Sequence, residues 1–121
     1  MTSVLITDNA AFMRVRMTNL LVDEGFAVFQ ARSGMQAVEM YRDFKPDIVL
    51  INLNSTNADG LSSIISIRQM DPKAKLIVLS SIGQEAELIE AIQMGASDFI
   101  VKPINQQCLF HKLHHLEQVG V

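Results

Sequence analysis

The sequence predicts an α/β fold in which five strand–helix units form one parallel β-sheet. Apolar runs of about four residues, such as residues 48–51, alternate with longer segments whose apolar residues recur at helical spacing. Because these runs are apolar at nearly every position, we expect strands that are buried on both faces of the sheet. A chain of 121 residues has room for one hydrophobic core, so we expect a single domain over residues 1–121.

The first unit begins with a strand at residues 4–6 and continues with a helix that ends at Gly25. The apolar residues of this helix fall on one face, which we expect to pack against the sheet. They are Met13, Met17, Leu20 and Leu21.

The second unit begins with residues 26–31, a less uniformly apolar strand that suits an edge of the sheet. Ser33 and Gln36 have the spacing of a capping box, in which the serine accepts a helical N–H and the glutamine reaches back. The helix that they start ends before Pro46. Its expected inward residues are Ala37, Tyr41 and Phe44.

The third unit joins the strand at residues 48–51 to a helix that ends at Asp71 and Pro72. It ends there because proline disfavours helical conformation in the residue before it. This helix is indicated by Leu61, Ile64, Ile65 and residues 68–70.

The fourth strand is predicted at residues 76–79, and Ser81 with Gln84 forms a second candidate capping box. The helix that follows ends at Gly95. The apolar residues that indicate this helix are Leu88, Ile89, Ile92 and Met94.

The fifth strand, at residues 99–101, is the shortest, and Asn105 is a suitable N-cap for the last helix. The inward stripe of that helix is formed by Leu109, Leu113 and Leu116. No linker interrupts the five units.

The composition excludes several classes of protein. A content of 49% hydrophobic and 19% charged residues favours a compact fold over disorder. No segment approaches the roughly 18 to 20 apolar residues of a membrane span, and the N-terminus does not resemble a signal peptide, so we expect a cytoplasmic protein without membrane association. The lone Cys108 agrees with that compartment. A net charge of −3 provides no basic surface for nucleic acid, so we expect a protein partner.

Polar residues follow four of the predicted strands at the point where each strand ends. In open α/β sheets, ligands bind at the carboxyl ends of the strands, beside the point where the strand order reverses. We therefore expect a site built from Thr7, Asp8 and Asn9, from residues 52–54, from Ser80 and Ser81, and from Lys102 and Pro103.

Three stretches carry a resemblance to a known family. They are KPDIVLINLNSTNADG at residues 45–60, DNAAFMR at residues 8–14, and the pair SSIGQ and FIVKP at residues 80–84 and 99–103. In these stretches, and over nearly the whole length from Val4 to Leu116, the chain resembles the receiver domains of two-component response regulators, especially the stand-alone chemotaxis receivers. The resemblance implies a flavodoxin-like three-layer sandwich with strand order 2-1-3-4-5.

Four positions match the residues that receivers use. By the resemblance, Asp8 is one metal-site carboxylate, Ser80 the hydroxyl switch residue, Phe99 the aromatic switch residue and Lys102 the phosphate-contacting lysine. On composition alone Phe99 is more often a core residue, and it can be both. Lys102 and Pro103 are expected to be joined by a cis peptide bond, as in the receivers that the chain resembles.

Other positions depart from the family. Asn52 stands where receivers have the aspartate that accepts a phosphoryl group, Asn9 replaces the second metal-site carboxylate, and Thr56 replaces a proline. An amide nitrogen is delocalised into its carbonyl group, so Asn52 should not attack phosphorus. Asp8, Asn9 and Asn54 remain as a remnant of the metal pocket. Since Mg²⁺ prefers anionic oxygens, we expect this remnant to bind it weakly or not at all and the protein to need no cofactor.

With two carboxylates replaced, we expect the pocket to be a settled polar network without metal. Asp8 is left facing Lys102, so a direct or water-bridged ion pair between them is expected. Asn9 and Asn52 would add neutral hydrogen bonds. Because two further family residues have changed beside Asn52, natural degeneration is favoured over an engineered substitution.

The last helix supplies the expected partner surface. Receivers use the face made by their fourth helix, fifth strand and fifth helix for partners and dimerisation, and here Ile104, Phe110, His111 and His115 are assigned to it. The candidate partners are a histidine kinase, a motility component or a second copy of the chain. His111, His114 and His115 also have the spacing of a transition-metal site, but no acidic or cysteine ligand is paired with them, so this interpretation is disfavoured.

The favoured function is a non-enzymatic pseudo-receiver that docks a protein partner without phosphorylation. The alternative is a working receiver, with Asn52 an artefact of mutation or deamidation, or with Ser55, Thr56 or Ser80 modified by another kinase. A phosphatase loop of the DxDxT type is disfavoured because residues 52–56, NLNST, have lost both aspartates. A flavin site is disfavoured because no phosphate-binding loop follows the first strand.

Overall fold

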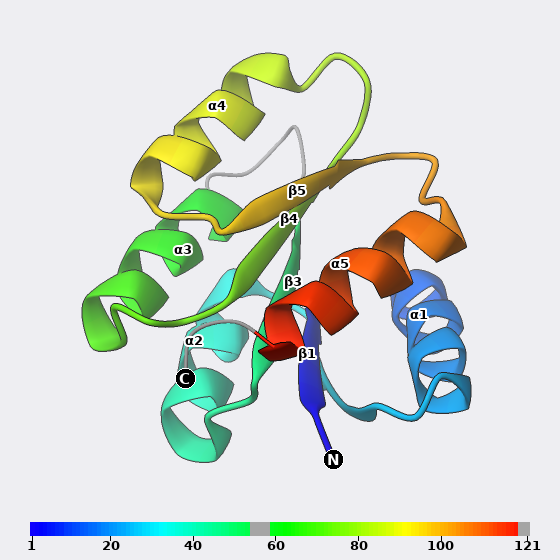
Figure 1. Cartoon of the computed structure of the whole chain (residues 1–121). Coiled ribbons are helices and arrows are strands. Elements are labelled where there is room, and N and C mark those ends of the chain that lie inside the picture. The colour runs from blue at the N-terminus through cyan, green and yellow to red at the C-terminus, as the bar shows by residue number, and fades with distance from the viewer. Residues whose placement is uncertain (54–58, 119–121) are drawn as a thin grey trace.

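The computed structural model describes residues 1–53 and 59–118, which form five parallel strands and five helices in alternation (Figure 1). The sheet order β2-β1-β3-β4-β5 confirms the predicted α/β architecture. The elements are β1 (Ser3–Thr7), α1 (Ala11–Asp23), β2 (Ala27–Ala31), α2 (Gly34–Phe44), β3 (Ile48–Asn52), α3 (Asp59–Met70), β4 (Leu76–Ser80), α4 (Glu85–Met94), β5 (Asp98–Val101) and α5 (Gln106–Gln118).

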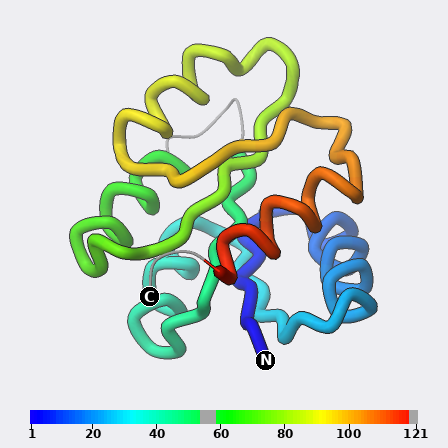
Figure 2. The backbone as a smooth tube through the Cα atoms, in the orientation of Figure 1, coloured from blue at the N-terminus to red at the C-terminus, as the bar shows by residue number. Residues whose placement is uncertain are grey.

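Helices cover both faces of the sheet, with α1 and α5 on one face and α2, α3 and α4 on the other (Figures 1 and 2). Successive side chains of a strand point to opposite faces, so β3 sends Ile48 and Leu50 to one core and Val49 and Ile51 to the other. All four are fully buried. This explains why the strand is apolar without alternation. Among the described residues, no helix combines the length and the apolar character needed to cross a bilayer.

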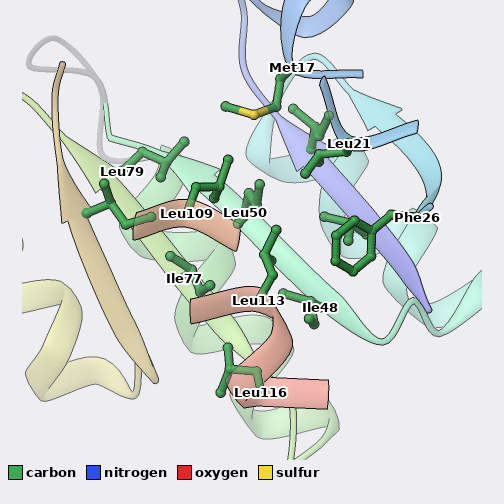
Figure 3. Packing of buried hydrophobic residues seen from close by; sticks show 13 residues of the cluster. Met17, Leu21, Phe26, Ile48, Leu50, Ile77, Leu79, Leu109, Leu113 and Leu116 are labelled. Atoms are coloured by element: carbon green, nitrogen blue, oxygen red, sulfur yellow. The ribbon is translucent and has the colours of Figure 1, made fainter. Parts of the chain in front are cut away.

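The core between the sheet and α5 depends on the predicted leucine stripe. Leu109, Leu113 and Leu116 project from α5 onto the strands (Figure 3). They meet side chains of β3 and β4, which include Leu50 and Ile77, and α1 closes the same cluster with Met17 and Leu21. The inward stripes predicted for the first and last helices are therefore confirmed.

Two of the three predicted helix starts are formed by the residues proposed for them. Ser33 Oγ accepts the N–H of Gln36 at 3.1 Å, and Asn105 Oδ1 accepts the N–H of Cys108 at 2.9 Å. Gln36 Oε1 accepts the N–H of Arg32 at 2.7 Å, one residue before the expected donor.

The second capping box is only half present. Gln84 Oε1 accepts the N–H of Ser81 at 2.7 Å, but α4 begins one turn later than that box implies, at Glu85, and no side chain caps it. At its other end the helix stops at Gly95, whose φ of 121° is readily adopted only by glycine.

The four apolar residues that indicated α4 do not share one environment. The α4 face that packs on the sheet runs through Leu88, Ala91 and Met94, whereas Ile89 and Ile92 are turned outward and are exposed. Both faces of α4 carry apolar residues at helical spacing, and the sequence does not distinguish them.

The inward assignment of Phe44 is wrong, because its side chain is exposed. Phe44 is the last residue of α2, beyond the end of the core. Its ring stacks on that of Phe29 in the edge strand β2, with the ring centroids 5.1 Å apart.

The start of α2 depends on a close contact with the start of α3. The N–H of Gly34 donates to Asp59 Oδ2, and a Cβ added at Gly34 would overlap the Asp59 carbonyl oxygen and lie 2.9 Å from Asp59 Cγ. The absent side chain of Gly34 therefore permits the approach of α3 to α2.

We predict that Gly34→Ala destabilises the protein by about 1–3 kcal/mol, because the added methyl group forces backbone atoms apart. Helix propensity alone would favour alanine by about 1 kcal/mol, so the sign of the change separates the two effects. Urea unfolding measures it. The neighbouring Met35→Ala is the control, since Met35 is exposed and its loss should change stability by about 0.5 kcal/mol or less. A stabilised Gly34→Ala variant would contradict the contact.

Candidate functional site

The parallel sheet brings the predicted strand ends to one edge. The N–H of Asp8 donates to the carbonyl of Ala31 at 3.0 Å, and the N–H of Lys102 donates to the carbonyl of Ser80 at 2.7 Å. Between these pairs lies the end of β3, where Asn52 is in register with Leu79 of β4. Asp8, Asn52, Ser80 and Lys102 are thus gathered as predicted, whereas Asn54 lies outside the described residues.

Asn52 separates two hollows at this edge. One, of about 180 Å³, is lined by Thr7, Asp8, Asn9, Arg32, Ser33, Gly34, Asn52, Asp59 and Gly60. The other, of about 370 Å³, is lined by Asn52, Leu53, Ser81, Ile82, Gly83, Gln84 and Lys102. The first hollow contains the carboxylates of Asp8 and Asp59, and we call it the acidic hollow. The second contains Lys102, and we call it the basic hollow. Asn52 lies at the boundary between them.

Each of the two carboxylates of the acidic hollow accepts a hydrogen bond from a backbone N–H at the start of a helix. Asp8 Oδ1 accepts the N–H of Ala10 at 2.9 Å, just before α1, and Asp59 Oδ2 accepts the N–H of Gly34 at the start of α2. Such contacts satisfy N–H groups that have no partner within the helix. The sequence reasoning used Asp59 only as a turn signal and missed its place in the hollow. Its position as the first residue of a helix after the central strand was the available signal.

The predicted direct ion pair between Asp8 and Lys102 is wrong. No ion pair joins these two residues, and they line different hollows. The physical reason is that the Asp8 carboxylate is turned back to the amide of Ala10, while Lys102 leaves β5 on the far side of Asn52.

Two buried side-chain oxygens of the acidic hollow, Asn52 Oδ1 and Thr7 Oγ1, have no hydrogen-bond partner among residues 1–53 and 59–118. The settled polar network around Asn52 stays a prediction.

The donors at this edge fit Mg²⁺ poorly. Mg²⁺ requires a nearly octahedral set of oxygen ligands and gives up its water reluctantly. Asn9 and Asn52 offer neutral amides, and one oxygen of each carboxylate, in Asp8 and in Asp59, already accepts a backbone N–H. Over residues 1–53 and 59–118, no three His, Cys, Asp or Glu side chains are placed to hold a metal ion.

The remaining positions that match receivers lie around β4 and β5. Ser80 is buried, at 1% exposure, and the peptide bond between Lys102 and Pro103 is cis, as predicted. Phe99 is 38% exposed, so its ring lies at the surface and not in the core. Lys112 Nζ lies 5.4 Å from the centroid of that ring and forms an ion pair with Asp98 at 2.7 Å.

The predicted partner surface is only partly exposed. His111 and His115 are exposed on α5, but Ile104 and Phe110 are partly buried against the core beneath α5. The expectation of an exposed Phe110 is therefore wrong, because its side chain packs against the core cluster that contains the leucine stripe. The sequence analysis did not assign the exposed apolar residues Ile89 and Ile92 to this surface.

His114 does not extend a metal-binding row with His111 and His115. Its two ring nitrogens instead face carboxylates of Glu24 and Glu117.

The largest of these hollows lies apart from Asn52, between α1 and the start of α5. It measures about 620 Å³, and its lining includes Met13, Met17, Leu20, Lys102, Pro103 and Ile104. Lys102 lines this groove as well as the basic hollow beside Asn52, so the two hollows are neighbours.

Comparison with known proteins agrees with the fold. Residues 4–114 match the model of the response regulator receiver domain. The chemotaxis protein CheY of Bacillus subtilis is 45% identical over 101 residues, which are 83% of this chain and 84% of that protein. CheY of Thermotoga maritima is 41% identical over 116 residues, which are 95% of this chain and 97% of that protein.

Solved receiver structures have the same fold. The response regulator domain of Thermotoga maritima CheB superposes with a TM-score of 0.86 at 29% identity, covering 99% of this chain and 98% of that one. The receiver domain of NtrX from Brucella abortus superposes with a TM-score of 0.88, covering 97% and 99%, and at 24% identity it supports the fold alone. The chain belongs to the response regulator receiver domain family and resembles its CheY-like members.

Proposed function

We propose that this receiver domain binds a protein partner without being switched by aspartyl phosphorylation. The observation that carries the proposal is Asn52, the last residue of β3. At the same edge of the sheet, Ser80 ends β4 and Lys102 directly follows β5. A receiver requires a carboxylate nucleophile at that place, and a carboxamide does not supply one.

The surroundings of Asn52 support the proposal. The two carboxylates that share its hollow are each engaged with a backbone N–H, and the set of donors fits Mg²⁺ poorly. Phosphoryl transfer depends on a metal ion to neutralise the developing charge. Loss of the nucleophile and weakening of the metal site therefore both oppose phosphorylation at position 52.

A protein-binding surface is available on the face made by α4, β5 and α5. Ile89, Ile92, Phe99 and Val101 are all exposed large hydrophobic residues of α4 and β5, and His111 and His115 lie beyond them on α5. Neighbouring exposed apolar groups of this kind favour association with another protein. The partner we propose is a histidine kinase, a motility component or a second copy of the chain. Of these, the motility component is favoured by the similarity to chemotaxis proteins of the CheY type.

The alternative is a receiver that is still switched by phosphorylation. Ser80, Lys102 and the cis bond to Pro103 are present at the places where working receivers need them, and the identity to CheY proteins exceeds 40%. In that case another residue accepts the phosphoryl group, or an aspartate at position 52 is the functional state.

We predict that beryllofluoride with Mg²⁺ leaves the amide NMR spectrum essentially unchanged. Beryllofluoride binds to a carboxylate as a phosphoryl mimic, and position 52 has none. The double variant Asn9→Asp with Asn52→Asp, which restores the carboxylate and the second metal ligand, is the positive control for the reagent. Saturable shifts at Ser80 and Phe99 in the unsubstituted protein would contradict the proposal.

We predict that Asn52→Asp alone recovers little phosphorylation by acetyl phosphate, because Asn9 still weakens the metal site. The double variant Asn9→Asp with Asn52→Asp should recover more, and acid-labile phosphate per chain measures both. Equal phosphorylation of the single and double variants would show that the argument about the metal is wrong.

We predict that millimolar Mg²⁺ raises the melting temperature of the unsubstituted protein by less than about one degree. A ligand at 100 times its dissociation constant would add about 2.7 kcal/mol, or several degrees for a domain of this size, whereas a weakly bound ion adds almost nothing. Thermal unfolding followed by circular dichroism gives the shift.

Two variants locate any metal that does bind. A rise of several degrees that Asp8→Ala abolishes would show a working remnant of the receiver site. A rise that depends on Asp59→Asn instead would assign the ion to the other carboxylate of the acidic hollow.

A further inference from the structure

A second cluster of titratable groups lies at the amino ends of the strands, whereas Asn52 lies at their carboxyl ends. His114 of α5 is at its centre. Its Nδ1 lies 2.6 Å from Glu117 Oε1, and its Nε2 lies 2.9 Å from Glu24 Oε2. Glu117 is one turn further along the same helix, whereas Glu24 is the residue that ends α1. The imidazole therefore joins the ends of two helices that are 90 residues apart in sequence.

Further contacts extend the cluster to the first two strands. The hydroxyl of Thr2 donates to Glu117 Oε2, so the last helix is also fastened to the residue before β1. Phe26, just before β2, stacks on the His114 ring with centroids 5.4 Å apart and an angle of 29° between the planes. The ring is thus held on one side by an aromatic face and along its rim by two carboxylates, and these contacts fix its orientation.

The geometry requires a particular protonation state. A neutral imidazole carries one N–H and one lone pair, so only one of its nitrogens can donate. Here both nitrogens face carboxylate oxygens, which only accept hydrogen bonds. The neutral ring would place a lone pair against an anionic oxygen at one of the two contacts, whereas the imidazolium donates to both.

The surrounding charges reinforce this preference. Asp47, before β3, also repels the negative charge of Glu117, and its carboxylate accepts hydrogen bonds from the N–H and the hydroxyl of Ser3. No lysine or arginine forms an ion pair with His114, Glu24 or Glu117 within residues 1–53 and 59–118. The cationic ring is therefore the only positive partner paired with these carboxylates there.

We propose that His114 is a proton-dependent clamp, which fastens the C-terminal half of α5 to the end of α1 and the start of β1 when the ring is protonated and releases it when the ring is neutral. The clamp is independent of Asn52, which lies at the other edge of the sheet. It acts on an element of the partner surface, because α5 carries His111 and His115. The proton concentration would thereby set how firmly one part of that surface is held.

The direction of the pH dependence follows from both partners. Hydrogen bonds to Glu24 and then to Glu117 raise the pKa of His114 above its ordinary value of 6.5, so its contribution is complete below that value and is lost as the pH rises through the folded-state pKa. Hydrogen bonds from Thr2 and then from His114 lower the pKa of Glu117 below 4.5, so its contribution is present above 4.5 and is lost in stronger acid. The clamp is therefore strongest at pH values between 4.5 and 6.5, and it is released as the pH rises through the folded-state pKa of His114.

The side chains are partly exposed, His114 at 45%, so solvent and salt screen the interaction and the effect is a local one. The test is amide hydrogen exchange in residues 113–117, corrected for the intrinsic pH dependence of exchange. We expect protection to fall by about threefold between pH 6 and pH 8.5, the factor typical of an exposed ion pair. His114→Gln should remove this dependence, and His115→Gln, on the exposed side of the same helix, should keep it.

A second measurement keeps the proposal testable if His114→Gln disturbs folding. The titration midpoint of His114, followed by NMR, should fall in Glu24→Gln and in Glu117→Gln. A midpoint that neither substitution changes would overturn the clamp, as would an equal pH dependence of exchange in His114→Gln and His115→Gln.

Discussion

The parallel hydrogen bonding of the central strands is the constraint on which the rest of the structure depends. Because β1, β3, β4 and β5 run in the same direction and in a fixed register, their carboxyl ends meet at one edge, where Asp8, Asn52, Ser80 and Lys102 are close in space although they are far apart in sequence. At the other ends of the strands, the starts of β1 and β2 lie beside the cluster of His114. The two clusters are thus separated by the length of the buried strands.

At the Asn52 edge, the side chains that remain serve structure more than chemistry. Asp8 and Asp59 each accept a backbone N–H at the start of a helix, which is a role that any receiver-like sheet needs regardless of phosphorylation. The fold therefore tolerates an amide at position 52, because the strands and helix starts do not require a carboxylate there. What the amide changes is the charge of the edge and its ability to attack phosphorus.

Much of the fold could be predicted because local and global signals agree. The strands are short, fully apolar runs, the edge strand is visibly less apolar, and the caps at Ser33 and Asn105 have local signatures. The outward orientation of Ile89 and Ile92 could not be predicted, because α4 is apolar on both sides. The separation of Asp8 from Lys102 was not predicted either. The order of the strands shows that both residues lie at the same end of the sheet, but it does not show which neighbouring group each side chain contacts. Asp59 was missed for the same reason.

The central claim is that the chain takes no phosphoryl group in the way receivers do. Intact-mass spectrometry after incubation with acetyl phosphate and Mg²⁺ tests it most directly, provided that the reaction is kept near neutral pH to preserve any acyl phosphate. The account predicts a single species at the unmodified mass, with a CheY protein of known activity giving a phosphorylated species in parallel. A stoichiometric gain of one phosphoryl group by this chain, on any residue, would contradict it.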